Sequence, residues 1–143
     1  MVFRGTFEYA IDGRGRLPIP ARYRDSFAEG MVLVQSPDGC IDIYTPEGYE
    51  AWGSFLTRVK PNRQRGRRLR RGFFGHSIDV ELDKQGRILV PPFLRQHADL
   101  SGTVLVIGRN ECLEIWNPQR WEAEDALVNE EYEAALESME ERP

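Results

Sequence analysis

The strongest constraint on the fold is an internal repeat, because two segments of the chain carry nearly the same motif. DGRGRLPIPARYR spans Asp12–Arg24, and DKQGRILVPPFLR spans Asp83–Arg95, which is a shift of 71 residues. A shift of 72 residues then aligns the segment beginning at Cys40 with the segment beginning at Cys112. The chain therefore contains two copies of one small unit.

Each copy is predicted to be a small β unit. TFEYAID and SIDVELD alternate apolar and polar residues, as strands do, and each runs into an Asp-x-x-Gly turn. A short strand follows, with Pro18 favouring an edge position, and then a short helix after Pro20 or Pro91. Two more strands and a helix after Pro46 or Pro118 complete each copy.

Four short strands cannot bury both faces of a sheet, so the two copies are expected to complete one another's core. We predict an α+β fold, mainly β, in which two units form a pseudo-dimeric core flanked by helices. The expected boundaries are 6–48 and 77–120 for the units, 49–76 for a helix and basic linker, and 121–143 for an acidic helical tail. Cys40 and Cys112 occupy the same position in the two copies and are predicted to be buried strand residues.

The charge is divided unequally along the chain, although the whole has a net charge of −4. Residues 1–121 hold 18 basic and 14 acidic residues, whereas 122–143 hold nine acidic residues and one arginine. The segment Arg58–Arg71 has eight basic residues and no acidic one. Such a run is typical of a phosphate-binding surface, and a solvated helix face is the alternative interpretation.

Membrane and enzymatic functions are poorly supported. No apolar run approaches the ~20 residues of a membrane span, and the first residues do not resemble a signal peptide, so we expect a cytoplasmic protein. Pro18 stands where a dinucleotide-binding motif would need glycine. His76 and His97 lack neighbours at metal-ligand spacing, so we expect surface or boundary histidines, no catalytic residues, no metal and no cofactor. Tyr49, Trp52 and Trp121 are predicted to pack helices on the sheet.

Several motifs together resemble the MraZ family, whose members contain two SpoVT-AbrB-type swapped-hairpin units. They are the paired D-x-x-G-R-[LI]-x-[IV]-P-x-x-x-R motifs, the opening FRGTFEYAID and the closing EIWNPQRWEA. The resemblance extends from Phe3 to about Ala123. It implies a nucleoid-associated transcription factor that forms rings and binds double-stranded DNA. The DNA sites it implies are G-rich direct repeats upstream of its own operon, in the division and cell-wall cluster.

The turns offer arginines suited to reading DNA. Arg14 and Arg16 flank Gly15 in a hairpin, and a β ribbon can enter a major groove roughly 12 Å wide. Arginine matches the two acceptors of guanine, whereas Arg22 and Arg24 are placed to hold phosphates. The predicted DNA-binding residues are Arg14, Arg16, Arg22, Arg24, Lys84, Arg87 and Arg95.

The charged residues of the two turns also admit a structural interpretation. The pairs Asp12 with Arg16 and Asp83 with Arg87 are also suited to closing their loops as ion pairs. The second copy has Gln85 and Phe93 where the first has arginine, so the first copy is expected to be the principal reader.

The alternative function is that of an antitoxin. Related swapped-hairpin units precede acidic tails that wrap a toxin protein, and the tail here carries an apolar stripe. The stripe consists of Ala126, Leu127, Tyr132, Leu136 and Met139. Against this alternative, such antitoxins carry one copy per chain, whereas here two copies are covalently joined.

Overall fold

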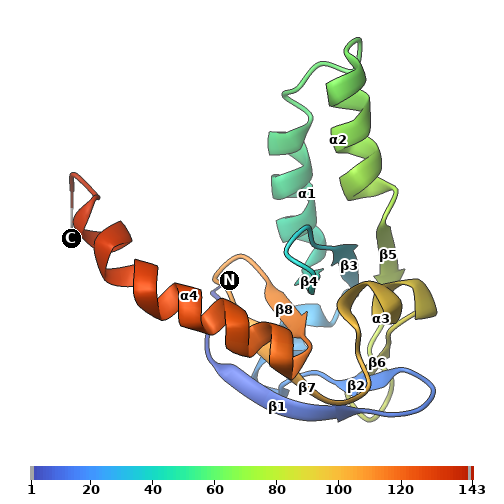
Figure 1. Ribbon diagram of the computed structural model, residues 1–143. Helices are drawn as coiled ribbons and strands as arrows, with labels where there is room; N and C mark the ends of the chain where they lie inside the picture. The colour runs from blue at the N-terminus through green and yellow to red at the C-terminus, as the bar shows by residue number, and fades with distance from the viewer. Residues whose placement is uncertain (1, 142) are drawn as a thin grey trace.

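The computed structural model describes residues 2–141 and 143, and it consists of two antiparallel sheets with helices packed around them (Figure 1). The first copy contains β1 (Thr6–Ile11), β2 (Arg16–Pro18), the 3₁₀ helix η1 (Ala21–Phe27), β3 (Met31–Gln35), β4 (Ile41–Tyr44) and α1 (Pro46–Leu56). The chain continues through α2 (Gln64–Phe74), β5 (Ser77–Val80), β6 (Arg87–Leu89), α3 (Pro92–Ala98), β7 (Gly102–Gly108), β8 (Leu113–Trp116) and α4 (Pro118–Glu137).

The larger sheet is built by exchange of strands between the two copies. Its order is β1-β7-β8-β4-β3-β5, so β1 of the first copy pairs with β7 of the second, and β5 pairs with β3. At the centre, β4 and β8 pair with Ile41 opposite Ile115. Each copy relies on strands of the other to complete its part of the sheet. This exchange confirms the predicted α+β fold with a pseudo-dimeric core.

The smaller sheet joins one strand from each copy. In the β2–β6 ribbon, Leu17 lies opposite Ile88, and both side chains are buried. They belong to the main core, together with Ile43 and Leu113 of the central strands. The core therefore lies between the ribbon and one face of the larger sheet, and both copies contribute to it equally.

The opposite face of the larger sheet is covered by α1 and α2, and by the start of α4. Tyr49 of α1 stacks on Phe73 of α2 with ring centroids 4.9 Å apart, and Trp121 of α4 lies 5.4 Å from Trp116. The packing predicted for Tyr49 and Trp121 is confirmed. It is wrong for Trp52, which is 43% exposed and stacks on Phe55 of the same helix.

The basic run does not form an extended linker. Most of it lies in α2, which runs beside α1 as a helical hairpin that rises from the sheet (Figure 1). Arg70 Nη2 donates to the carbonyl oxygen of Thr57 and Arg67 Nη1 to that of Pro61, both at 3.0 Å, so two arginines of the run tie the hairpin loop to α2. The other basic residues of the run, among them Arg68 and Arg71, are exposed and able to contact other molecules.

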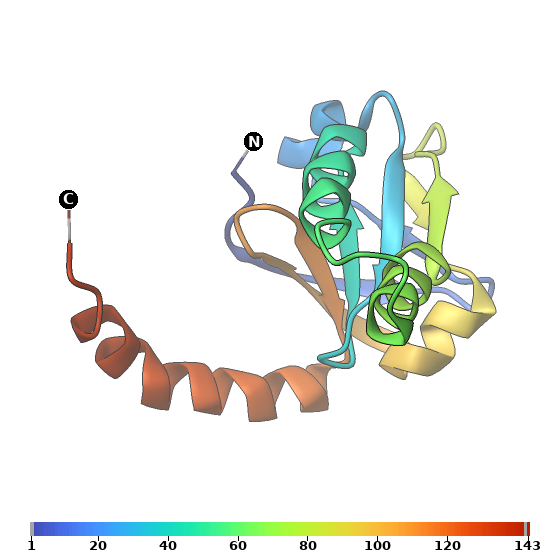
Figure 2. The ribbon, with the colours of Figure 1, turned by 90° about the horizontal axis from the view of Figure 1, so that it is seen from above.

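The acidic tail forms one continuous helix, α4. Asn117 Oδ1 caps it by accepting the backbone amides of Gln119 and Arg120. Beyond its first turns α4 runs away from the sheet and from the α1–α2 hairpin (Figures 1 and 2). Among the described residues, no helix is long and apolar enough to cross a membrane.

The predicted burial of both cysteines is confirmed, but neither lies within a strand; the two histidines lie at the surface or boundary as predicted. Cys40 and Cys112 are free and buried, each directly before a central strand, and burial raises the pKa of both thiols. His76 is exposed. His97 is half-buried with Nε2 2.7 Å from the carbonyl oxygen of Ser36.

Candidate nucleic-acid interface

The first Asp-x-x-Gly turn is held by its aspartate. Asp12 Oδ1 accepts the backbone amides of Arg14 and Arg16, both at 2.9 Å. The turn closes when the amide of Gly15 donates to the Asp12 carbonyl, with Gly15 at φ 91°. The Arg16 amide is the main reason that the pKa of Asp12 lies below its ordinary value. Asp12 therefore holds the backbone that carries the arginines.

The second turn has the same backbone and one additional contact. Asp83 Oδ1 accepts the amides of Gln85 and Arg87, and the Arg87 amide is the main cause of the lowered pKa of Asp83. In addition, Arg87 Nε lies 3.2 Å from Asp83 Oδ2. The loop-closing ion pair is thus confirmed for Asp83 and Arg87, whereas Asp12 acts through backbone amides.

The two turns are interlocked through their glycines. The amide of Val90 donates to the carbonyl of Gly15 at 2.8 Å, and the amide of Ile19 donates to the carbonyl of Gly86 at 3.0 Å. A Cβ on Gly15 would lie 2.6 Å from the Val90 oxygen and 2.8 Å from Arg95 Nε. Each glycine is therefore required by its partner copy as well as by its own turn.

The last arginine of each motif supports the turn of the other copy. Arg24 Nε donates to the carbonyl of Ile19 at 2.9 Å, and its guanidinium lies against Gly86. Arg95 Nε donates to the carbonyl of Val90 at 3.0 Å, and its guanidinium lies against Gly15. Sequence reasoning missed this contact. The predicted phosphate contacts of Arg24 and Arg95 remain predictions for their other guanidinium donors.

The ribbon brings arginines of both copies onto one face. Arg16 pairs with Leu89, and Arg87 pairs with Pro18, two positions along the ribbon. Directly paired residues share a face and successive residues alternate, so all four lie opposite the buried Leu17. Arg16 and Arg87 therefore share the outward face, at a diagonal separation of roughly 7–8 Å between backbones.

Two of the other predicted residues lie in the turns beside this outward face. Arg14 and Lys84 are exposed within the two turns that precede the ribbon strands. Arg22 is exposed on η1, with its guanidinium carbon 5.9 Å from the Tyr23 ring. We define the outward face of the ribbon and its two turns as the ribbon surface, and its cations come from both copies.

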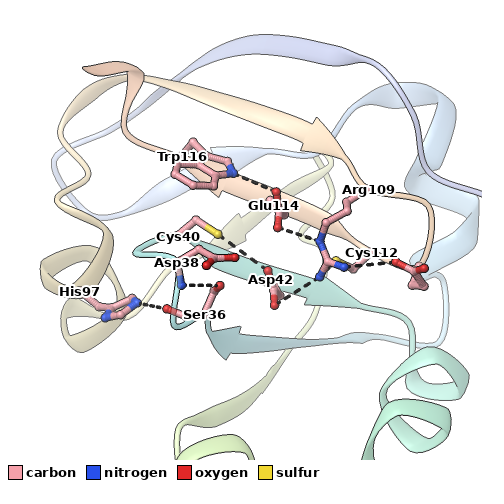
Figure 3. A network of polar contacts seen from close by, with 10 residues as sticks. Ser36, Asp38, Cys40, Asp42, His97, Arg109, Cys112, Glu114 and Trp116 are labelled. Atoms are coloured by element: carbon pink, nitrogen blue, oxygen red, sulfur yellow. Dashed lines mark hydrogen bonds and ion pairs between the residues drawn. The ribbon is translucent and has the colours of Figure 1, made fainter. Parts of the chain in front are cut away.

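A second polar cluster, which sequence reasoning missed, lies on the central strands (Figure 3). Asp42 of β4 is paired with Glu114 of β8, and both are buried. Arg109 joins them, with Nε 2.8 Å from Glu114 Oε2 and Nη2 3.7 Å from Asp42 Oδ2. Trp116 Nε1 donates to Glu114 Oε1 at 3.0 Å. Burial, and then the charge of Glu114, raise the pKa of Asp42 to about 7.

This cluster neutralises charge inside the protein. Sγ of Cys40 and carboxylate oxygens of Asp42 and Glu114 lie within 4.8 Å of one another, yet Arg109 already contacts both carboxylates. The available signal was an acidic residue at the same place in the two copies, in CIDI and CLEI. Arg109 itself aligns with Pro37, so the repeat gave no indication of it.

The fold and the ribbon surface define a class, the tandem swapped-hairpin proteins, in which two joined copies form one core. A family model described as "MraZ protein, putative antitoxin-like" matches residues 2–69 and again residues 73–142. The chain belongs to the MraZ family.

Curated relatives agree with this assignment along nearly the whole chain. One from Lachnoclostridium phytofermentans is 39% identical over 124 residues, covering 85% of this chain and 86% of the relative. One from Heliobacterium modesticaldum is 38% identical over 138 residues, covering 96% of each. One from Coxiella burnetii is 38% identical over 136 residues, covering 90% of each. All three are named "Transcriptional regulator MraZ", which agrees with the expectation of a protein that is not an enzyme.

Proposed function

We propose that this protein is a sequence-specific DNA-binding transcriptional regulator that acts in the cytoplasm, at the nucleoid. The names of its relatives support regulation of transcription. The observation that carries the proposal is the placement of Arg16 and Arg87 on one outward face of a two-stranded ribbon. A ribbon of this kind fits a major groove, where arginine forms paired hydrogen bonds with guanine.

The residues of the ribbon surface divide into two roles. Arg14 and Arg16 read bases in the principal turn, and Arg87 and Lys84 add contacts from the second turn. Arg22, Arg24 and Arg95 hold phosphates and set the position of the ribbon without reading sequence. The rigid backbone of both turns supports this division, because a reading side chain must start from a fixed position.

The proposed target is a set of G-rich direct repeats in the promoter of its own division and cell-wall operon, and the proposed assembly is a ring. A single ribbon provides only a few kcal/mol of base discrimination, which is too little to select one promoter in a genome. Several ribbons on one ring make each later contact effectively intramolecular, so affinity can rise ~10²–10⁴-fold.

The experiment is a gel-shift series on the promoter at fixed salt. Deleting direct repeats one at a time should reduce affinity steeply. Changing their spacing by about half a helical turn should do the same, because it rotates one repeat to the far side of the duplex. An isolated repeat that binds as tightly as the full array would contradict the ring-based mechanism, and a promoter that binds no better than random DNA would contradict the function.

An antitoxin function is the second candidate. The description of the family model and the exposed apolar residues of the acidic helix α4 favour it. It predicts that a toxin protein co-purifies at fixed stoichiometry. A regulator of the proposed kind instead purifies as a large homo-oligomer that retards its own promoter.

A further inference from the structure

The helix α4 is an arm with exposed apolar residues, several of which share one side that faces solvent. Val128 and Tyr132 are four residues apart and so share a face, which Met139 extends beyond the helix end. Their exposed fractions are 41%, 65% and 58%. On the opposite side, Glu130, Glu133 and Glu137 follow the same helical spacing. Within the described residues, no side chain of α4 is buried.

The arm cannot cover its apolar side against its own subunit. Its first turns pack beside β7 and Trp116, and its remaining length points away from the rest of the chain in both views (Figures 1 and 2). A 20-residue helix is about 30 Å long, so the far end of α4 lies well beyond the sheet. The apolar side of α4 is therefore open to contact by another molecule.

A complementary surface lies on α1. Trp52 and Phe55 are 43% and 50% exposed and stack on each other at 5.2 Å. Two grooves flank them, with volumes of about 800 Å³ and about 660 Å³, and Trp52 and Tyr44 line both. We call this surface, formed by Trp52, Phe55 and the two grooves, the Trp52 surface. Its two stacked rings are contiguous, unlike the apolar residues that are scattered singly over an ordinary protein surface.

Basic residues border the Trp52 surface on the side of α2. The grooves themselves also contain acidic residues, Glu47 and Glu111 in the larger one and Asp38 and Asp42 in the smaller one. Arg58 lies over the Phe55 ring at 5.3 Å, and Arg68 of α2 lines the smaller groove. The basic run from Arg58 to Arg71 contains no acidic residue, whereas 122–143 carries nine acidic residues and one arginine. Opposite charges around an apolar contact favour its formation and set its orientation.

We propose that the α4 arm of one subunit docks on the Trp52 surface of a second copy of the chain. This inference rests on the proposed ring and names the contact that would build it. Pairing between two arms is disfavoured, because it brings two strongly acidic helices together. Each subunit then gives one arm and receives one, and a head-to-tail contact of this kind closes into a ring when its rotation permits.

The test uses two full-length variants with complementary defects. The arm variant carries Val128→Glu and Tyr132→Glu, and the surface variant carries Trp52→Ser and Phe55→Ser. Ala134→Glu is the control for added negative charge on α4, because it places a glutamate on the face that carries Glu130 and Glu137. Light scattering after size exclusion measures the mass of each protein and of mixtures.

We expect each variant alone to have the mass of a single 16.5 kDa chain, and the control to remain a large oligomer. An equimolar mixture of the two variants should form a one-to-one complex, because one partner supplies an intact arm and the other an intact surface. This recovery also demonstrates that both variants are folded. An arm variant that stays fully oligomeric, a surface variant that does so, or a mixture that stays monomeric would each overturn the docking proposal.

Different outcomes would contradict the docking proposal and the proposed DNA-binding function. A dispersed arm variant should bind a single direct repeat as tightly as the unaltered protein does, and it should lose only the gain from multiple repeats. If neither protein distinguishes the promoter from random DNA while the mixing result holds, the DNA-binding function fails and the docking stands. If a toxin protein competes with the arm for the Trp52 surface but the purified chain is monomeric, the second copy is the wrong occupant.

Discussion

The two turns of the ribbon surface have the same backbone but different side chains. Both use an aspartate to hold two amides and a glycine with positive φ. In the first turn Arg14 is exposed where the second has Gln85, and in the second Arg87 is held by Asp83. The interlocked fold requires the aspartate and the glycine that both turns share. The other side chains of the turns are not fixed in this way, so they are where the two copies can differ in function.

This difference makes the two turns unequal halves of one surface. Arg16 and Arg87 lie on the same face, only two positions apart along the ribbon. Because Arg87 Nε also contacts the Asp83 carboxylate, Arg87 has fewer donors left for a base than Arg16, which Asp12 holds through its backbone amide. The first turn is therefore proposed to read bases, and the second to support it.

The largest expected effect is the difference in promoter binding between variants at Arg16 and at Arg87. Arg16→Ala should abolish specific promoter binding, because each bidentate contact contributes ~1–3 kcal/mol and the loss is repeated in every subunit of the assembly. Arg87→Ala should weaken binding less. Gel shifts against promoter and random DNA measure both, and light scattering should find both oligomers intact. Equal losses in the two variants would show that the turns act as equals.

The next effect concerns stability and compares the two glycines. Gly15→Ala should cost more than the ~1–3 kcal/mol of a strained backbone, because its Cβ meets the fixed carbonyl oxygen of Val90. Gly86→Ala should cost less, because its Cβ meets the side chain of Arg24, which can move. Gly13→Ala has open space and serves as the control. The urea unfolding midpoint should be lowest for Gly15→Ala, intermediate for Gly86→Ala and nearest the unaltered protein for Gly13→Ala. The reverse order would contradict the interlocking of the turns.

A smaller effect concerns the cluster on the central strands. Because burial raises the pKa of Asp42 to about 7 from an ordinary 3.8, the folded state binds a proton that the unfolded state has lost. That contribution to stability is complete below about pH 4 and is lost as the pH rises through about 7. Asp42→Asn should reduce this loss, which amounts to about 1 kcal/mol per pH unit. Urea unfolding of both proteins across this pH range measures it, and identical pH profiles would contradict the assignment.

The smallest effect exchanges the differing residues of the two turns. Gln85→Arg should raise promoter affinity a few-fold by giving the second turn a further cation, and Arg14→Gln should lower it and relax base preference. Binding to a panel of repeats with single base changes measures both. If Gln85→Arg tightens binding to random DNA equally, its arginine contacts phosphate and not bases.

Much of the fold could be predicted from the sequence, because a repeated sequence motif indicates a repeated structural unit. The Asp12 and Asp83 turns, the strands around them and the shared core all follow from local patterns repeated at one spacing. What could not be predicted depends on contacts between distant segments. Arg24 against Gly86, and Arg109 between Asp42 and Glu114, arise only after strands are exchanged.

The exposure of Trp52 also escaped prediction, for a related reason. An aromatic residue on a helix beside a sheet is expected to pack inward, and Tyr49 on the same helix does. Which face of α1 turns inward depends on where α2 lies, and α2 falls in the basic segment that was predicted as a linker. The sequence pattern places a residue on a helix but does not place the helix on the sheet.

The exchange of strands has a consequence during synthesis on the ribosome. Thr6 of β1 pairs with Ile107 of β7, so the first strand to be made has no partner until about a hundred more residues have been translated. At a translation rate of ~5–20 residues per second, β1 of the nascent chain stays unpaired for several seconds. During this interval β1 is able to pair with a β7 strand from a neighbouring nascent chain, which would join two subunits by a domain swap.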